Sequence, residues 1–71
     1  MNDIGWAVEQ LNSGKKVARE GWNGRGMYLG LRPRSNEMTL PYVYMRTVQG
    51  DLIPWLCSQS DLLADDWVLV E

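Results

Sequence analysis

Residues 40–55 read LPYVYMRTVQGDLIPW, and this stretch decides the fold class because it has the pattern of a β-hairpin. Its first half alternates β-branched and aromatic residues, so Tyr42 and Tyr44 fall on one face of a strand. Val43 and Met45 fall on the opposite face, which we expect to be the core side.

The turn of this hairpin is expected at residues 49–51, where Gly50 can adopt a positive φ. The chain then returns antiparallel through LIPW, until Pro54 removes a backbone donor from the hydrogen-bonded ladder. We therefore expect this strand to stop at Pro54 or to lie at an edge of the sheet.

The N-terminal segment has the 3.6-residue spacing of an amphipathic helix. Asn2 or Asp3 can cap it, and Gly14 is expected to follow its last turn. The apolar side chains expected on its buried stripe are Ile4, Ala7, Val8 and Leu11. Trp6 lies beside this stripe, and we expect it to pack against the core.

Further strands are expected at residues 16–19 and 27–31, joined by a glycine-rich loop. Ser60 or Asp61 can cap a short helical turn over the leucines that follow, and residues 67–70 form a last strand. The sequence thus predicts the α+β class, with an N-terminal helix packed on a small antiparallel β-sheet and a short helical turn before the C-terminal strand.

The length of 71 residues predicts one domain, spanning residues 1–71, with a core of marginal size. We expect a homo-oligomer, because self-association is a common stabiliser of so small a fold. The single cysteine, Cys57, excludes an intrachain disulfide and fits a reducing cytosol. No segment has the pattern of a signal peptide or a membrane span, so we expect no membrane partner.

The composition also limits the chemistry. The net charge is −2 without runs of one sign, which disfavours binding to a nucleic-acid polymer. The chain has no histidine, which removes the usual proton shuttle of neutral-pH catalysis. We expect Cys57 to be structural, Asp61 to cap a helical turn, and Asp65 and Asp66 to be solvated end residues.

The stretch GWNGRG has neither the dinucleotide-binding nor the Walker spacing of glycines. Its glycines could let backbone N–H groups approach an anion, and Arg25 could add a charged fork to a phosphate. A tight turn with Trp22 in the core is the alternative, and the residues alone favour it.

A tryptophan, Trp55, precedes the polar run Ser58, Gln59, Ser60 and Asp61. An aromatic face beside amides and carboxylates suits a base with ribose hydroxyls, whereas a core tryptophan followed by a capped turn is the plain alternative. Composition and spacing do not decide between these two interpretations. Tyr42 and Tyr44 could form a stacking platform or an oligomer interface, and we favour the interface.

Two strings of the sequence, GKKVAREGWNGRGM and PWLCSQSDLLADDW, resemble the phage Thoeris anti-defence family of the second type. The blocks that contain them cover most of the chain. The resemblance implies a tetrameric sponge without cofactor or catalysis, which sequesters a cyclic ADP-ribose-type signal in the cytoplasm of the infected host. The resemblance further implies binding of cyclic dinucleotides in separate pockets, a property of some members.

The resemblance also implies which residues meet the ligand. The matching positions are Trp22, Asn23, Trp55, Ser58, Gln59 and Asp61. To these residues we add Arg25, which is expected from its charge to bind a phosphate of the ligand. Pockets shared between subunits are expected, because 71 residues leave little room to enclose such a ligand in one chain.

The short connection RPRSNEMTL, residues 32–40, departs from many members of the family, which carry a longer insertion here. Arg32, Arg34 or Asn36 could supply substitute contacts to the ligand. Two other functions remain open from the residues. One is a protein-interaction module whose Trp and Tyr residues form the core and an interface, and the other is a nucleotide-cleaving enzyme that uses Asp61.

Overall fold

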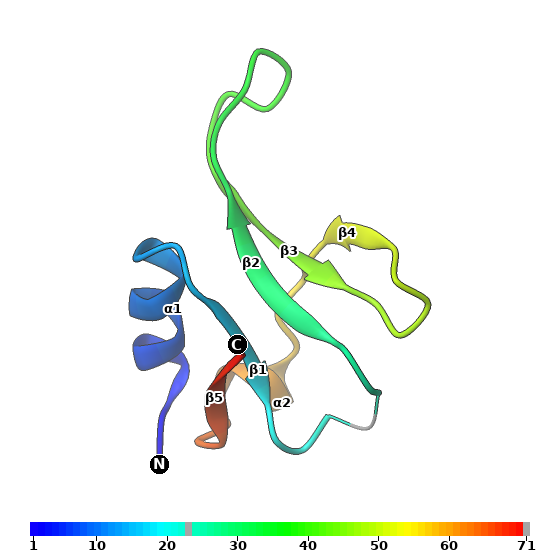
Figure 1. Ribbon diagram of the computed structural model, residues 1–71. Coiled ribbons are helices and arrows are strands. Elements are labelled where there is room, and N and C mark those ends of the chain that lie inside the picture. Colours follow the sequence, from blue (N-terminus) through cyan, green and yellow to red (C-terminus); the bar gives the residue numbers. More distant parts are fainter. Residues whose placement is uncertain (23, 71) are drawn as a thin grey trace.

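The computed structural model describes residues 1–22 and 24–70, which form two helices and five strands. The elements are α1 (Ile4–Asn12), β1 (Lys16–Arg19), β2 (Tyr28–Arg32), β3 (Tyr42–Arg46), β4 (Leu52–Pro54), α2 (Gln59–Leu62) and β5 (Trp67–Val70). The expected α+β class is confirmed. Figure 1 shows α1 beside the sheet and α2 just ahead of β5 along the chain.

The five described strands form one antiparallel sheet in the order β4-β3-β2-β1-β5. Strand β5 returns to pair with β1, so Val17 has Leu29 of β2 on one side and Leu69 of β5 on the other. Strand β4 lies at an edge, as Pro54 predicted. Gly50 has a φ of 92° in the turn before β4, which confirms the hairpin.

The strand register divides the side chains of the sheet between two faces. The inner face carries Val17, Leu29, Leu31, Val43, Met45 and Trp67. Helix α1 covers this face, since its Ala7 and Leu11 are buried in the same cluster. The outer face carries Lys16, Tyr28, Gly30, Arg32, Tyr42 and Tyr44. The expected core side of β3 is therefore confirmed.

Helix α1 begins as predicted, since Oδ1 of Asp3 accepts a hydrogen bond of 2.9 Å from the Trp6 backbone N–H. Gly14 follows the last turn with a φ of 83°. The predicted burial of Val8 is wrong, because its side chain is 46% exposed. The buried stripe of this nine-residue helix is narrower than predicted and consists of Ala7 and Leu11.

The predicted cap of α2 is also wrong. Ser58 is the N-cap, because its Oγ accepts a hydrogen bond of 3.1 Å from the Asp61 backbone N–H. Ser60 and Asp61 lie inside the helix, and Leu63 closes it with an exposed side chain. The carboxylate of Asp61 is consequently not engaged in capping and points to partners elsewhere in the fold.

Candidate functional site

Three tryptophans meet at one end of the inner face. Trp67 is fully buried, and the rings of Trp22 and Trp55 contact it edge-on. The centroid distances are 5.5 Å for Trp22 and 6.1 Å for Trp55, with interplanar angles of 79° and 86°. Trp22 and Trp55 are only partly buried, so each packs against the core and keeps exposed ring surface.

Asp61 joins this cluster through the indole of Trp22, whose Nε1–H donates to Asp61 Oδ1 over 3.1 Å. The side chain of Asp61 is 13% exposed. Burial acts to raise the pKa of Asp61, but hydrogen bonds from Arg19, Trp22 and Ser58 outweigh it and hold the pKa below its usual range. Asp61 is therefore an ionised carboxylate that can only accept hydrogen bonds.

Arg19 and Asp66 complete the cluster, and the sequence patterns did not identify either of them. The guanidinium of Arg19 donates to Asp61 over 2.8 Å and to Asp66 over 2.7 Å. Asp66 is paired with Arg19 and its side chain is only 26% exposed, so the prediction of a solvated end residue is wrong. The hydrogen bonds from Arg19 also lower the pKa of Asp66. Strand alternation could have indicated Arg19, because it lies two residues after the buried Val17.

The other expected binding residues differ in their position and exposure relative to this cluster. Ser58 and Gln59 are exposed at the start of α2, where Ser58 serves as the cap. Arg25 is exposed on the glycine-rich loop and makes no ion pair within the described chain. Asn23 lies outside the described residues. The cluster therefore unites Trp22, Trp55 and Asp61 from the two sequence blocks.

At the glycines of the loop, other side chains of the protein lie close to the backbone. A Cβ on Gly21 would lie 2.9 Å from Oδ2 of Asp66 and 3.3 Å from Nη2 of Arg19. Gly26 has a φ of 74°, and its carbonyl oxygen accepts a hydrogen bond of 2.9 Å from Nη1 of Arg46. The glycines thus allow the loop to close against the sheet.

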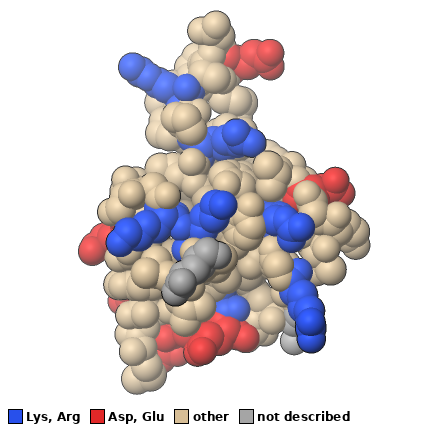
Figure 2. Space-filling view, viewed as in Figure 1, with Lys and Arg blue, Asp and Glu red and all other residues tan. Residues whose placement is uncertain are grey.

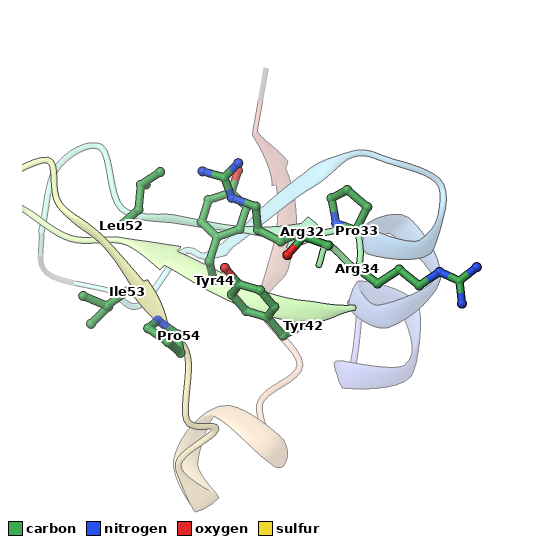
Figure 3. Close-up of a pocket in the computed structure, with 9 residues that line it drawn as sticks. Arg32, Pro33, Arg34, Tyr42, Tyr44, Leu52, Ile53 and Pro54 are labelled. Carbon is green, nitrogen blue, oxygen red and sulfur yellow. The ribbon is translucent and has the colours of Figure 1, made fainter. Parts of the chain in front are cut away.

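A hollow of about 380 Å³ lies on the outer face beside β3 and β4, apart from the tryptophan cluster. Its side chains include Arg32, Tyr42, Tyr44, Leu52 and Pro54. Figure 3 shows the Arg32 guanidinium above the Tyr44 ring, with 5.3 Å to the ring centroid, and Arg34 extending away from the other side chains. Residues 33–41 stand away from the body at the end opposite to the glycine-rich loop (Figure 1). The hollow and the tryptophan cluster are separate sites.

The surface charges are unevenly distributed. In Figure 2, Lys and Arg side chains form a band across the visible face, whereas the largest group of Asp and Glu side chains lies toward its lower end and others lie at its edges. A chain with a net charge of −2 therefore still presents positive charge to an anion on this face.

Two classes of site do not occur within the described part of the chain. Its Cys, Asp and Glu residues form no group of three or more that could hold a metal ion. No described helix is both long enough and apolar enough to cross a membrane. The candidate site thus consists of indole rings, an ionised carboxylate and the arginine that pairs with it.

Fold and site together define a small α+β domain with a tryptophan and carboxylate cluster at one end of its sheet. Residues 2–70 match the family of the Thoeris anti-defense 2-like domain, and the chain belongs to this family. It is 32% identical to Thoeris anti-defense 2 of Bacillus phage SP01 over 82 aligned positions, which cover 94% of this chain and 92% of that protein. This membership confirms the predicted family and supports a role in phage anti-defence.

Proposed function

We propose that the protein sequesters a cyclic ADP-ribose-type immune signal, glycocyclic ADP-ribose, and thereby keeps the Thoeris effector inactive. The observation that carries this proposal is the contact between Trp22 and Asp61, which puts an exposed aromatic surface beside an ionised acceptor. Family membership supports the target, because the relative from phage SP01 is named for action against Thoeris.

Each part of the cluster has a role in this proposal. The exposed surfaces of Trp22 and Trp55 stack on the adenine, an interaction worth about 1–3 kcal/mol per base. Arg19 and Trp22 both donate to Oδ1 of Asp61, and we assign the acceptor of a ribose hydroxyl to Oδ2. Arg25 contributes charge to a phosphate, and Asn23, Ser58 and Gln59 supply further polar contacts.

The proposed binding is non-catalytic. Asp61 is stabilised in its ionised form by Arg19 and Trp22, which makes it a weak base and a poor donor of protons at neutral pH. A general acid or base requires a pKa near the working pH, and the sequence contains no histidine to provide one. These properties favour a binder without cofactor over a nucleotide-cleaving enzyme.

Assembly is the second part of the proposal. The protein forms a homo-tetramer in the cytoplasm of the infected host, with ligand pockets between subunits. Leu56 is 92% exposed and directly follows Trp55, and Leu63 is 80% exposed at the end of α2, the helix that carries Asp61. Large apolar side chains so exposed next to a site are typical of a surface that another subunit covers.

Cyclic dinucleotides, the signals of CBASS systems, are the second ligand class that we propose. The outer-face hollow supports this extension, because Arg32 offers charge and Tyr42 and Tyr44 offer rings apart from the tryptophan cluster. Arg34 of the short connection also lines this hollow, so we assign it to the second ligand and not to the first.

Calorimetry with glycocyclic ADP-ribose tests the proposal. The wild-type protein is expected to bind, and heating the complex is expected to release the ligand intact. Asp61→Asn is expected to weaken binding, whereas Glu9→Gln on α1, far from the cluster in the chain, serves as the control of equal charge change. No binding by the wild-type protein would refute sequestration, and recovery of a cleaved product would refute the non-catalytic mechanism.

One alternative has its own observation in favour. A protein-interaction module would also expose Leu56 and Leu63 and would use the tryptophans only for packing. Trp55→Phe separates the two functions, since it preserves an aromatic ring against Trp67 but reduces the stacking surface. A loss of nucleotide affinity with unchanged assembly supports sequestration, and the opposite result supports the module.

A further inference from the structure

Arg19 occupies a position that the strand pattern reserves for an apolar side chain. It ends β1 on the same face as the buried Val17 and pairs in register with the buried Trp67. Its side chain is only 20% exposed. A charge placed against the core in this way requires partners, because its desolvation is costly otherwise.

The partners are two carboxylates from the other end of the chain. Nε of Arg19 donates to Oδ1 of Asp66 over 2.7 Å, and Nη2 donates to Oδ2 over 3.4 Å. Nη1 donates to Oδ1 of Asp61 over 2.8 Å. The planar guanidinium thus holds a fork on Asp66 and a third bond on Asp61, a pattern that lysine cannot reproduce.

Each carboxylate in turn holds one residue of the glycine-rich loop. Oδ2 of Asp66 accepts from the Gly21 backbone N–H over 2.9 Å, and Oδ1 of Asp61 accepts from Trp22 Nε1–H over 3.1 Å. The Trp22 backbone N–H donates to the Arg19 carbonyl over 3.2 Å, which closes the turn. Backbone and side chain at the start of the loop are both tied to one guanidinium.

We propose that Arg19 is a positioning residue of the nucleotide site, which orients Trp22 and Asp61 for the ligand through its ion pairs with Asp61 and Asp66. This inference rests on the proposed function. Three of the five N–H donors of Arg19 are engaged within the protein, so its role does not require contact with the ligand. Without it, two carboxylates would lie close together and Trp22 would lose an aligned acceptor.

Gly21 provides a second way to disturb the same network. The space for its Cβ is filled by the Asp66 carboxylate and the Arg19 guanidinium, at 2.9 Å and 3.3 Å. Its φ is not among the positive values of the described glycines, so alanine meets no backbone strain there. Gly21→Ala should therefore displace the ion pairs without a change of charge.

The test combines calorimetry with the indole N–H signals of a ¹⁵N-labelled sample. Arg19→Lys and Gly21→Ala are compared with Lys16→Arg, a charge-conserving exchange on the same strand. Arg19→Lys and Gly21→Ala should shift the Trp22 signal, leave the Trp6 signal in place, and weaken binding of glycocyclic ADP-ribose about tenfold, the effect of losing one charge-assisted hydrogen bond. Lys16→Arg should change neither the Trp22 signal nor the affinity for glycocyclic ADP-ribose.

The outcomes separate this inference from the function on which it rests. Wild-type affinity in folded Arg19→Lys and Gly21→Ala overturns the positioning role, even if the Trp22 signal shifts. Unfolding of both variants by circular dichroism overturns it too, because Arg19 is then a stability residue. A wild-type protein that does not bind refutes the proposed function instead, and an unchanged Trp22 signal in both variants then shows that Arg19 does not orient the indole.

Discussion

Replacement of Trp22 by phenylalanine isolates the hydrogen bond that joins the two sequence blocks. Phenylalanine retains an aromatic edge toward Trp67 but has no Nε1–H for Asp61. A hydrogen bond to a charged group contributes about 1.5–3 kcal/mol. Trp22 is only partly buried, so water can replace the lost donor and the lower end of that range applies. We expect a loss of about 1.5 kcal/mol in the free energy of unfolding.

For a domain of this size, the expected loss lowers the melting temperature by roughly 6–12 °C. Urea unfolding followed by far-ultraviolet circular dichroism measures the loss of free energy of unfolding. The slope of this free energy against urea concentration should equal that of the wild type. Trp6→Phe is the matched control, because Trp6 packs against the core from α1 and its indole nitrogen has no hydrogen bond to the described residues. A loss for Trp22→Phe no larger than for Trp6→Phe would refute the role assigned to the hydrogen bond.

The same structure yields three further predictions. Leu29→Ala should destabilise the protein by about 2–5 kcal/mol, because Leu29 is fully buried, whereas Leu69→Ala at a 46% exposed position should cost much less; urea unfolding measures both. The lowered pKa values of Asp61 and Asp66 predict stability that is fully present above the ordinary aspartate pKa of about 3.9 and is lost as the pH falls through the lowered values. Melting temperatures should therefore be level from pH 7 to about 5 and drop in acid, and a drop in Asp61→Asn as large as in the wild type would contradict this. Cys57 is exposed, but partial desolvation and the nearby charge of Asp61 raise the pKa of its thiol, so its reaction with a thiol reagent at pH 7 should be slower than that of a free cysteine.

The elements of the fold were largely predictable because their signals are local. Hydrophobic alternation placed β3 and its core side, and the spacing of apolar residues placed α1. Gly50 marked the hairpin turn, and Pro54 marked the edge strand. Each of these signals depends on backbone geometry within a few residues, so the sequence alone carries it.

The errors arose where packing chooses among local options that the sequence allows. Ser58, Ser60 and Asp61 are all acceptable helix caps, and the structure uses Ser58. Val8 has helical spacing for burial, yet the short α1 covers the sheet with Ala7 and Leu11 and leaves Val8 46% exposed. Neither outcome could be read from the segment itself, since each depends on what lies against it.

The sequence by itself determined the class of fold, the family and the two blocks that hold Trp22 and Asp61. Only the tertiary structure decided that these side chains meet, since their hydrogen bond spans 39 positions of the chain. It also revealed Arg19 and Asp66, which are 47 positions apart. The physical reason is that β5 pairs with β1, which brings the C-terminal carboxylates beside the end of β1, where the inward-facing Arg19 reaches both.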